Sequence, residues 1–354
     1  MSIISTGKGN SKYNIYITKN GILKSVLNSH LSRKNKILIV TDNGVPSKYI
    51  NSLKKDIKNK DIFTIVLKKG EKSKSFDSYQ KILNKLIKLK FDRSDYLVAL
   101  GGGVVGDITG FVASSYLRGI DYIQIPTTLL AQVDSSLGGK TAINLKHGKN
   151  LVGAFYNPKL VLISTHFLQS LSNDEYKSGL GEVLKYALIG NKTLKNIIEN
   201  NTNKIIARNE SILKAIIEES VKTKSKIVTK DERESGVRAI LNFGHTFGHA
   251  IEAYNDYKNI THGAAITLGM VIASKVSFFE GHLKDYQLNN IINMINSLDL
   301  CSDHSQYNYS KLKKYMASDK KVKDGKLNLI LINRRFKAFK TSKYNLKNVI
   351  KSFN

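Results

Sequence analysis

The sequence predicts two domains: an N-terminal α/β domain with a Rossmann-like, mainly parallel sheet, and a mostly α-helical C-terminal domain. Three observations carry this prediction. The 354 residues are too many for one small core. Short apolar runs alternate with helical segments in the first half, as in a parallel sheet covered by helices. From about residue 173 to residue 317 nearly every segment has helical periodicity. We therefore expect domains at 1–165 and 166–354.

Five short apolar runs are the expected strands of the sheet. They cover residues 36–41, 61–67, 96–100, 121–125 and 160–164. Between the second and the third run, residues 76–90 carry apolar side chains at helical spacing with lysines between them. In the C-terminal half, residues 326–332 predict a late strand and residues 344–352 a short helix.

The composition narrows the classes of site and partner. A single cysteine, Cys301, excludes a disulfide framework and a cysteine-based zinc cluster within one chain, so a metal needs histidine and carboxylate ligands. The net charge of +28 would suit nucleic acid, but lysines spread along the whole chain favour a solvated surface and no nucleic-acid partner. The N-terminal segment lacks an apolar signal core, and the longest apolar stretch, 263–274, is too short to cross a bilayer. We expect a cytoplasmic protein with no membrane partner.

A glycine cluster follows the third expected strand and opens a helix. Gly101, Gly103 and Gly106 satisfy the pattern G-x-G-x-x-G. Glycines let the backbone approach a pyrophosphate, and free N–H groups at the helix start face the anion. A tight strand-to-helix turn alone would also use glycines. The flanking strand and helix favour phosphate or dinucleotide binding, although a standard Rossmann half is not established because this is not the first strand's loop.

Polar residues gather in the next segment, 126–141. It contains five hydroxyl residues, the carboxylate of Asp134, and Lys140 after two glycines. A lysine after two glycines resembles a phosphate-binding loop, without the full Walker spacing. A helix cap and a flexible turn are the alternative. The composition favours a polar site lining.

Three histidines within a short stretch suggest a metal site. His245 and His249 lie one turn apart on one helix face, and His262 follows at the start of another expected helix. Neutral imidazoles in this arrangement can share a metal, or one can bind the metal while the other handles protons. Glu182 and Lys185 share a face of a helix that we expect to begin near Gly179. Spacing alone leaves open whether they form a surface ion pair or point inward.

These segments together resemble the 3-dehydroquinate synthase family. The matching stretches are GGGVVGDITGF (101–111), SSYLRG (114–119), IPTTLLAQVDSSLGGKTAIN (125–144), GKNLVGAFYNP (148–158), SGLGEVLKYALI (178–189), DERESGVRAILNFGHTFGHAIEA (231–253), HGAAITLGM (262–270) and DKK (319–321). They stand in the family's order and spacing over roughly residues 36–330.

The resemblance implies a homodimer, with an NAD-binding α/β domain, a helical metal- and substrate-binding domain, and an active site in the cleft between them. It implies the conversion of 3-deoxy-D-arabino-heptulosonate 7-phosphate to 3-dehydroquinate and phosphate, the second step of the shikimate pathway in aromatic amino acid and chorismate biosynthesis. NAD would be oxidant and then reductant within one turnover. The metal would be Zn²⁺, with Co²⁺ as an alternative.

The resemblance also assigns roles to individual residues. Glu182, His245 and His262 match the metal ligands. Lys140, Asn150, Asn242 and Lys320, or its neighbour Lys321, match residues that hold the substrate phosphate, with His249 handling a proton nearby. Lys224 and Arg238 match the carboxylate site, Asp134 and Lys185 match contacts to substrate hydroxyls, and Arg118 would serve the site of the partner subunit. The matching NAD positions are Asp42, Lys69, Gly70, Glu71, Lys72, Ser73, Lys74, Gly103, Val104, Val105, Gly106, Asp107, Thr127, Thr128, Lys140, Lys149, Phe167, Leu168, Gln169 and Ser170.

Two departures from the family pattern affect the NAD periphery. Position 44 is glycine, where some relatives place a second ribose-binding side chain. The family's usual Leu-Pro turn is Leu171-Ser172 here. Both departures lie at positions that would contact the periphery of the cofactor and not at the metal ligands.

Two other enzyme classes remain open at this point. A related sugar-phosphate cyclase would use the same NAD and metal chemistry, but a substrate without a carboxylate has no use for both Lys224 and Arg238. A metal- and NAD-dependent polyol dehydrogenase would release NADH, whereas the synthase reaction has no net redox change.

Overall fold

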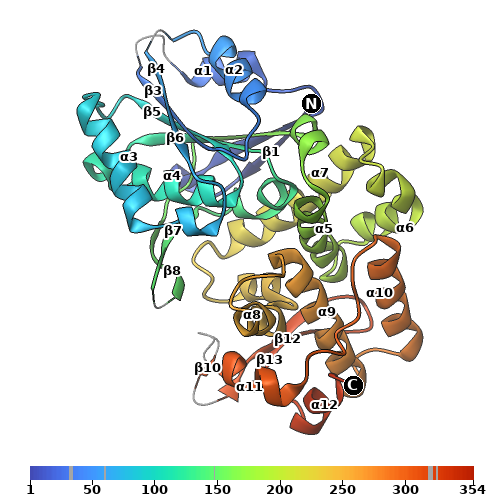
Figure 1. Ribbon diagram of the computed structural model, residues 1–354. Helices are drawn as coiled ribbons and strands as arrows, with labels where there is room; N and C mark the ends of the chain where they lie inside the picture. Colours follow the sequence, from blue (N-terminus) through green and yellow to red (C-terminus); the bar gives the residue numbers. More distant parts are fainter. Residues whose placement is uncertain (32–34, 60, 147, 318–321, 324–325) are drawn as a thin grey trace. The chain divides into compact units, whose positions relative to one another are not determined.

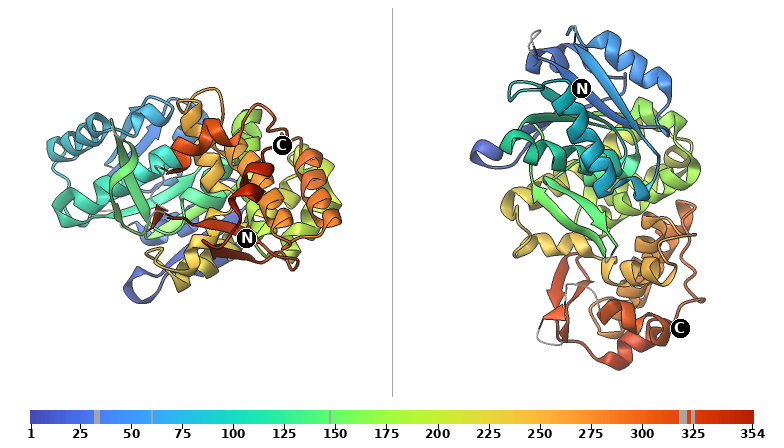
Figure 2. Two further views of the ribbon diagram at one scale, coloured as in Figure 1. Left: turned by 90° about the horizontal axis from the view of Figure 1, so that it is seen from below. Right: turned by 60° about the vertical axis from the view of Figure 1, so that its left-hand side comes forward.

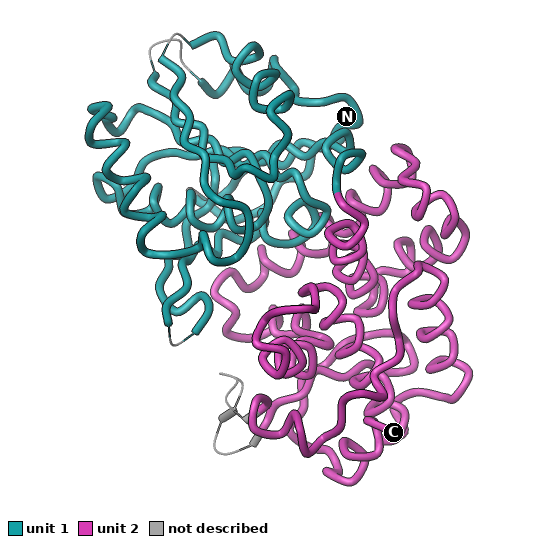
Figure 3. The backbone as a smooth tube through the Cα atoms, in the orientation of Figure 1, with its two compact units in different colours: residues 1–171 teal, residues 172–354 magenta. Residues whose placement is uncertain are grey.

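The computed structural model describes residues 1–31, 35–59, 61–146, 148–317, 322–323 and 326–354. These residues form two compact units, Met1–Leu171 and Ser172–Asn354 (Figure 3). The first unit thus ends slightly later in the chain than the boundary predicted between residues 165 and 166. Lys320 and Lys321, the predicted phosphate ligands near the C-terminus, lie outside the described residues.

Unit 1 is built on a seven-stranded sheet, which confirms the predicted Rossmann-like class (Figure 1). In spatial order its strands are β1 (Ser2–Thr6), β2 (Tyr13–Thr18), β9 (Leu160–Ser164), β6 (Asp121–Pro126), β5 (Tyr96–Gly101), β3 (Ile37–Asp42) and β4 (Ile62–Leu67). Every neighbouring pair from β2 to β4 is parallel, and only β1 is antiparallel to its neighbour. Strands β1 and β2 were not predicted.

Helices cover both faces of this sheet (Figures 1 and 2). Alternate residues of each strand point to opposite faces, so Leu38 of β3 packs in one core and Ile39 in the other. Helices α3 (Phe76–Lys88) and α4 (Gly103–Ser115) close the first core, whereas α1 (Lys24–His30) and α2 (Ser47–Asp56) close the second. Burial on both faces explains why these strands are nearly continuous apolar runs.

The strand order reverses between β3 and β5. From β3 the chain crosses to β4 at the sheet edge, then returns past β3 to β5 and continues to β6. In open α/β sheets, ligands bind outside the carboxyl ends of strands at such a switch point. Here those ends are Asp42 and Gly101, which places the predicted dinucleotide motif where this rule expects it.

A two-stranded hairpin, β7 (Lys140–Leu145) and β8 (Gly148–Phe155), follows β6 and was not predicted. It packs on α4: Ile143 is fully buried in the first core, and a Cβ atom at Gly110 of α4 would lie 2.4 Å from the Thr141 methyl carbon. The hairpin therefore joins the unit through close packing on a helix that glycine makes possible.

Unit 2 is mainly helical, as predicted. Its helices are α5 (Asn173–Leu188), α6 (Lys192–Ile206), α7 (Glu210–Lys230), α8 (His245–Tyr254), α9 (His262–Phe279), α10 (Asp285–Ser297), α11 (Tyr309–Ala317) and α12 (Leu346–Lys351). Its short strands are β10 (Val322–Lys323), β11 (Lys326–Leu327), β12 (Leu329–Ile332) and β13 (Ala338–Thr341). The predicted late strand corresponds to β11 and β12, and the predicted last helix to α12.

Helix α9 is the centre of unit 2. It is longer than the apolar stretch seen in the sequence, and by length and hydropathy alone it could cross a membrane. However, 72% of it is buried inside the protein, as in the core helix of a folded domain. Helices α5 and α8 pack against it and bring together residues that lie far apart in the sequence.

Candidate active site

In the glycine cluster of unit 1, Gly103 and Gly106 each lie against a different neighbouring side chain, where a larger residue would be crowded. Helix α4 begins at Gly103, directly after β5. A Cβ atom at Gly103 would lie 2.8 Å from the Ser135 hydroxyl, and one at Gly106 would lie 3.1 Å from the Gln124 side-chain oxygen on β6. Glycines thus allow close helix–strand contact and leave the first N–H groups of α4 available to an anion. The pattern thus permits a tight turn, and it is compatible with the anion site that the sequence predicts.

Asp42 and Gly44 lie at the end of β3, on the other side of the switch point. The Asp42 carboxylate is buried and accepts the Gly44 N–H at 2.8 Å. A Cβ atom at position 44 would lie 2.6 Å from Cδ of Lys69. The glycine that departs from the family pattern therefore leaves room for Lys69, itself a predicted NAD residue.

Except for Lys140 and Lys149, the predicted NAD residues of unit 1 follow the carboxyl ends of its strands. Asp42 ends β3, residues 69–74 follow β4, Gly103–Asp107 follow β5, Thr127 and Thr128 follow β6, and residues 167–170 follow β9. Val105 and Leu168 are fully buried in the protein, so neither residue is exposed to a ligand in this structure. The NAD assignments remain predictions, and their common edge supports them.

Lys74 connects predicted cofactor and substrate residues. Its side chain is buried, and its ammonium group donates to the Asp107 carboxylate and to the Asn150 side-chain oxygen. Asn144, which the sequence did not single out, lies beside these residues. Its side-chain amide donates to the Glu71 carboxylate at 2.8 Å. Lys140 is exposed at the start of β7, and Lys149 is half-buried in β8.

In unit 2, the three predicted metal ligands meet from three helices. Glu182 is fully buried in α5, His245 opens α8 and His262 opens α9. The Glu182 Oε1 atom lies 3.5 Å from Nε2 of His245 and 3.7 Å from Nε2 of His262. Donor atoms bound at about 2.1 Å in tetrahedral directions around one zinc ion lie about 3.4 Å apart. The donor types and separations therefore fit a divalent metal.

The other ring nitrogen of each histidine is held by a neighbour. His245 Nδ1 lies 3.2 Å from the Phe243 carbonyl oxygen, and His262 Nδ1 lies 3.2 Å from a Glu252 carboxylate oxygen. Acceptors at Nδ1 place a proton there and leave both Nε2 atoms toward Glu182, which is how protein metal sites orient histidine ligands. Glu252 was not singled out from the sequence. Its spacing of seven residues from His245 puts it on the same helix face, the signal that could have found it.

The interpretation of Glu182 and Lys185 as a surface ion pair is wrong, as is the expected helix start near Gly179. Helix α5 begins at Asn173, and the Lys185 ammonium group contacts the Glu182 carboxylate with both side chains almost fully buried. Gly181 lies inside the helix because α9 crosses here: a Cβ atom on it would lie 2.6 Å from the Gly263 carbonyl oxygen. The glycines mark close helix packing, which buries the pair.

The charge state of His262 reflects its two acidic neighbours. Burial opposes a charge on the ring, but contacts with Glu182 and Glu252 outweigh burial and raise the His262 pKa to about 10. Two carboxylates around one imidazole thus stabilise positive charge at this position, as a cation site requires.

The predicted carboxylate-binding residues are buried in unit 2. Lys224 lies in α7, and Arg238 follows a turn organised by Asp231. The Asp231 carboxylate accepts the N–H groups of Ser235, Gly236 and Arg238 at 2.7–2.9 Å. Burial acts against ionisation of Asp231, but these bonds outweigh it and lower its pKa to about 2. The Arg238 guanidinium group donates to the Glu232 carbonyl oxygen.

Other predicted substrate residues are placed as follows. The Asn242 side-chain amide donates to the Glu234 carboxylate at 2.6 Å, so Glu234 is a further candidate that the sequence did not reveal. The His249 ring centroid lies 5.3 Å from that of His245 and 6.1 Å from that of His262. In unit 1, Asp134 lies in a π-helical turn, and Arg118 is exposed with a left-handed φ of 65°. Their substrate roles remain predictions.

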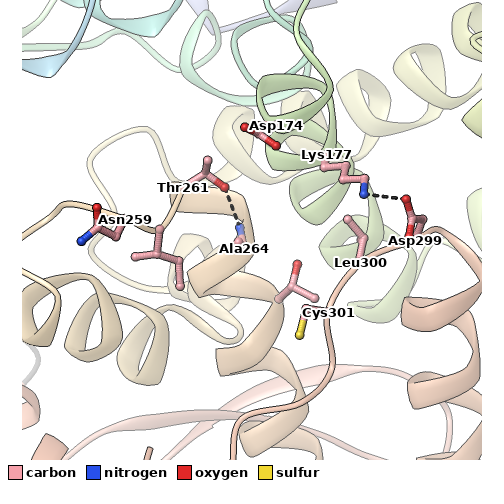
Figure 4. Close-up of a pocket in the computed structure, with 10 residues that line it drawn as sticks. Asp174, Lys177, Asn259, Thr261, Ala264, Asp299, Leu300 and Cys301 are labelled. Atoms are coloured by element: carbon pink, nitrogen blue, oxygen red, sulfur yellow. Dashed lines mark hydrogen bonds and ion pairs between the residues drawn. The ribbon is translucent and has the colours of Figure 1, made fainter. Parts of the chain in front are cut away.

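A separate pocket of 590 Å³ lies in unit 2, beside the first turn of α9 (Figure 4). Asp174 and Lys177 of α5, Thr261 and the 299–301 loop line it, and Lys177 forms an ion pair with Asp299 across it at 2.5 Å. Among the described residues, no predicted site residue lines this pocket.

Comparison with known proteins identifies the family. The family model described as 3-dehydroquinate synthase N-terminal matches residues 64–178, and the C-terminal model of the same enzyme matches residues 179–322. The 3-dehydroquinate synthase of Vesicomyosocius okutanii is 42% identical over 98% of this chain and 96% of its own length. That of Prochlorococcus marinus is 44% identical over 91% of each chain.

Solved structures of related enzymes share the fold. The 2-epi-5-epi-valiolone synthase of Streptomyces hygroscopicus, with NAD⁺ and Zn²⁺ bound, superposes with a TM-score of 0.87 at 25% identity, over 99% of this chain and 97% of that one. An iron-containing alcohol dehydrogenase is more distant, with a TM-score of 0.66 at 16% identity over 96% of each chain. Two family models match the chain, and a relative is 42% identical to it over nearly its full length. These findings confirm the resemblance, and the chain belongs to the 3-dehydroquinate synthase family.

Proposed function

We propose that this chain is a phosphate-eliminating cyclase that converts 3-deoxy-D-arabino-heptulosonate 7-phosphate to 3-dehydroquinate and phosphate. The observation that carries the proposal is the centre formed by the buried Glu182 and His245 and the partly exposed His262, with an acceptor at each histidine Nδ1. It occurs in a chain about 42% identical over nearly its whole length to enzymes with this name. The reaction needs a metal and NAD. One chain that has both a candidate metal site and a sheet edge suited to a dinucleotide matches this need.

Each unit supplies one part of the chemistry. When bound, NAD⁺ accepts and returns a hydride, and a divalent metal held by Glu182, His245 and His262 lowers the pKa of a substrate hydroxyl. The strand ends of unit 1 would bind the dinucleotide, with the N-terminus of α4 toward its pyrophosphate.

Buried cationic side chains of unit 2 suit the substrate carboxylate. Arg238 and Lys224 are at most 5% exposed, so a carboxylate bound to them would be largely shielded from water. Lys185 and Asp134 would orient the substrate hydroxyls. Two buried cations at these positions favour a carboxylated substrate over sugar phosphates that lack the carboxylate.

The phosphate end requires cationic and amide donors. Lys140, Asn150 and Asn242 would bind it, and His249 would hold or move a proton there. Oxidation of the neighbouring hydroxyl makes the proton to be lost acidic, and the substrate phosphate itself can accept that proton before it leaves. No strong protein base is then needed at this step.

We also propose that the protein is a homodimer in the cytoplasm. The exposed Arg118 follows Leu117 in a left-handed backbone conformation, with φ angles of 65° and 51°. Strained backbone of this kind is typical of functional positions. An Arg118 that serves the partner subunit's active site would account for both its exposure and its strain.

The test is phosphate release by the purified protein with NAD⁺ and Zn²⁺. We expect catalytic release of phosphate from the heptulosonate phosphate without accumulation of NADH. Stoichiometric NADH would instead identify a polyol dehydrogenase, the class suggested by the fold of the alcohol dehydrogenases. Faster turnover of a hexose phosphate that lacks the carboxylate would identify a related cyclase. In a parallel metal analysis, His262→Ala should lose tightly bound zinc.

A further inference from the structure

We propose that Asn144 is a positioning residue that couples the NAD-binding loop to the turn that binds the substrate phosphate. The inference rests on the proposed function, because it takes residues 70–74 as cofactor ligands and Asn150 as a phosphate ligand. Asn144 itself has no assigned role in binding. Its position makes the two sites parts of one hydrogen-bonded group.

Asn144 bonds to both segments at once. Its backbone N–H donates to the Lys74 carbonyl oxygen at 2.7 Å, and its side-chain amide donates to the Glu71 carboxylate at 2.8 Å. Its side-chain oxygen accepts the Asn150 N–H at 3.0 Å. One side chain therefore uses both its donor and its acceptor to join two loops that lie far apart in the sequence.

The pairing of the hairpin is irregular where Asn144 faces Asn150. The pairing of β7 with β8 runs regularly to Ile143 opposite Val152, then shifts so that Leu145 pairs with Gly148. Between these pairs β7 has one residue, Asn144, whereas β8 has three, Lys149, Asn150 and Leu151. The extra residues therefore lie in β8, where Asn144 accepts the Asn150 N–H, and irregularities of this kind next to binding sites commonly re-aim a side chain.

The acceptor bond holds Asn150 in an uncommon conformation. Asn150 has a left-handed φ of 56°, which a non-glycine residue adopts at some energetic cost. Asn144 fixes its main chain, while the Lys74 ammonium group holds its side-chain oxygen. Lys74 also contacts Asp107 at the start of α4. The Asn150 side chain is thus fixed by groups that belong to the cofactor site.

A ligand that orders one of these sites should therefore increase the affinity of the other site for its own ligand. A dinucleotide that binds Glu71, Lys74 and Asp107 removes motion from the 70–74 loop, and Asn144 transmits that order to Asn150. By linkage, NAD⁺ must raise the affinity for phosphate by the same factor as phosphate raises the affinity for NAD⁺. We expect a factor of about ten, within the usual range for coupled sites.

The experiment measures this factor by calorimetry on the zinc-loaded, full-length protein. Inorganic phosphate is titrated with and without saturating NAD⁺ in the wild type, in Asn144→Ala and in Asn144→Asp. The alanine variant loses both side-chain bonds. The aspartate variant keeps the acceptor for the Asn150 N–H but loses the donor to Glu71. Asn200→Ala, which removes one local bond from an exposed helix position, is the matched control.

We expect the coupling factor to fall from about ten to below about two in Asn144→Ala and to be intermediate in Asn144→Asp. The control should keep the wild-type factor. A purely structural role would lower both affinities or the thermal stability and leave their ratio unchanged, which would overturn the inference. Equal phosphate affinity with and without NAD⁺ in the wild type would also overturn it. If Asn144→Ala does not fold, the aspartate variant decides. A wild type that binds both ligands with coupling but does not release phosphate from the substrate contradicts the proposed function instead.

Discussion

Replacement of Gly263 by alanine should push α9 away from α5 and weaken the metal centre that these helices carry. A Cβ atom at position 263 would lie 1.9 Å from the Ser178 carbonyl oxygen and 2.4 Å from the Ser178 Cα atom. Both are backbone atoms of α5, so no side-chain rotation relieves the overlap. His262 directly precedes Gly263, and Glu182 lies one turn after Ser178. Any separation of the helices therefore moves two metal ligands apart.

The expected loss of stability follows from two opposing effects. Overpacking of a core position costs about 1–3 kcal/mol of the free energy of unfolding, and overlap with backbone belongs at the upper end. Alanine returns up to about 1 kcal/mol, because it favours a helix more than glycine does. We expect a net loss of about 2 kcal/mol, with metal affinity reduced about tenfold because the ligand geometry is disturbed.

Urea unfolding and competition with a chelator measure the two effects of Gly263→Ala. Ser178→Ala is the matched control, because it removes the hydroxyl that accepts the Gly263 N–H at 3.0 Å but adds no volume. It should lose only about 1 kcal/mol, the usual contribution of a hydrogen bond. If Gly263→Ala has wild-type stability and metal affinity, the close packing of α5 and α9 does not hold the site together.

Three further predictions concern charged side chains. Lys185→Met should destabilise the metal-free protein by about 3–5 kcal/mol, because it removes the ammonium group that contacts the fully buried Glu182 carboxylate and leaves only the two histidine rings beside it, and zinc should restore much of this loss in thermal unfolding. Asp231→Asn should be less stable than the wild type at pH 7. Because the folded pKa is lowered from 3.8 to about 2, this difference should be present above pH 4 and disappear as the pH falls through about 2, measured by circular dichroism. Lys74→Met should weaken NAD⁺ and phosphate binding by about tenfold or more, because its ammonium group contacts both Asp107 and Asn150; calorimetry that shows a loss for only one ligand would contradict this shared role.

The sheet of unit 1 was predictable because its strands are buried on both faces and end in recognisable turns. Strand β1 was missed because it lies at the sheet edge and has only five residues, of which Ile3 and Ile4 are apolar. Strands β7 and β8 were not predicted for another reason. Their sequence has the glycines and polar residues of a loop, and their order depends on packing against α4. Local sequence does not contain that tertiary contact.

The site was predictable where one helix carries it and not where two helices must meet. The spacing of His245 and His249 indicates a shared face without knowledge of the fold. Glu182 could not be distinguished from a surface ion pair, because its burial depends on α9 crossing at Gly181. Glu252 acquires its role only when α9 brings His262 to within 3.2 Å of its carboxylate.

The same two carboxylates that orient His262 should make metal binding depend on pH. With a pKa of about 10, the metal-free ring carries a proton at neutral pH, and a metal at Nε2 must displace it. Because this folded-state pKa is raised from 6.5, the charged ring stabilises the metal-free protein fully below pH 6.5, and this contribution is lost as the pH rises through about 10. Apparent metal affinity should therefore rise about tenfold per pH unit from pH 7 to pH 9.

Calorimetry in two buffers of different ionisation enthalpy counts the protons released per metal ion bound, and we expect about one at pH 8. Glu252→Gln is the informative control. Its amide oxygen still accepts the Nδ1–H but carries no charge, so the His262 pKa should fall and the steep part of the pH profile should move to lower pH. Metal binding at pH 8 without proton release would show that His262 is neutral before the metal arrives. Glu182 and Glu252 would then orient the ring without charging it, and the pH dependence of metal binding would have to come from another ligand.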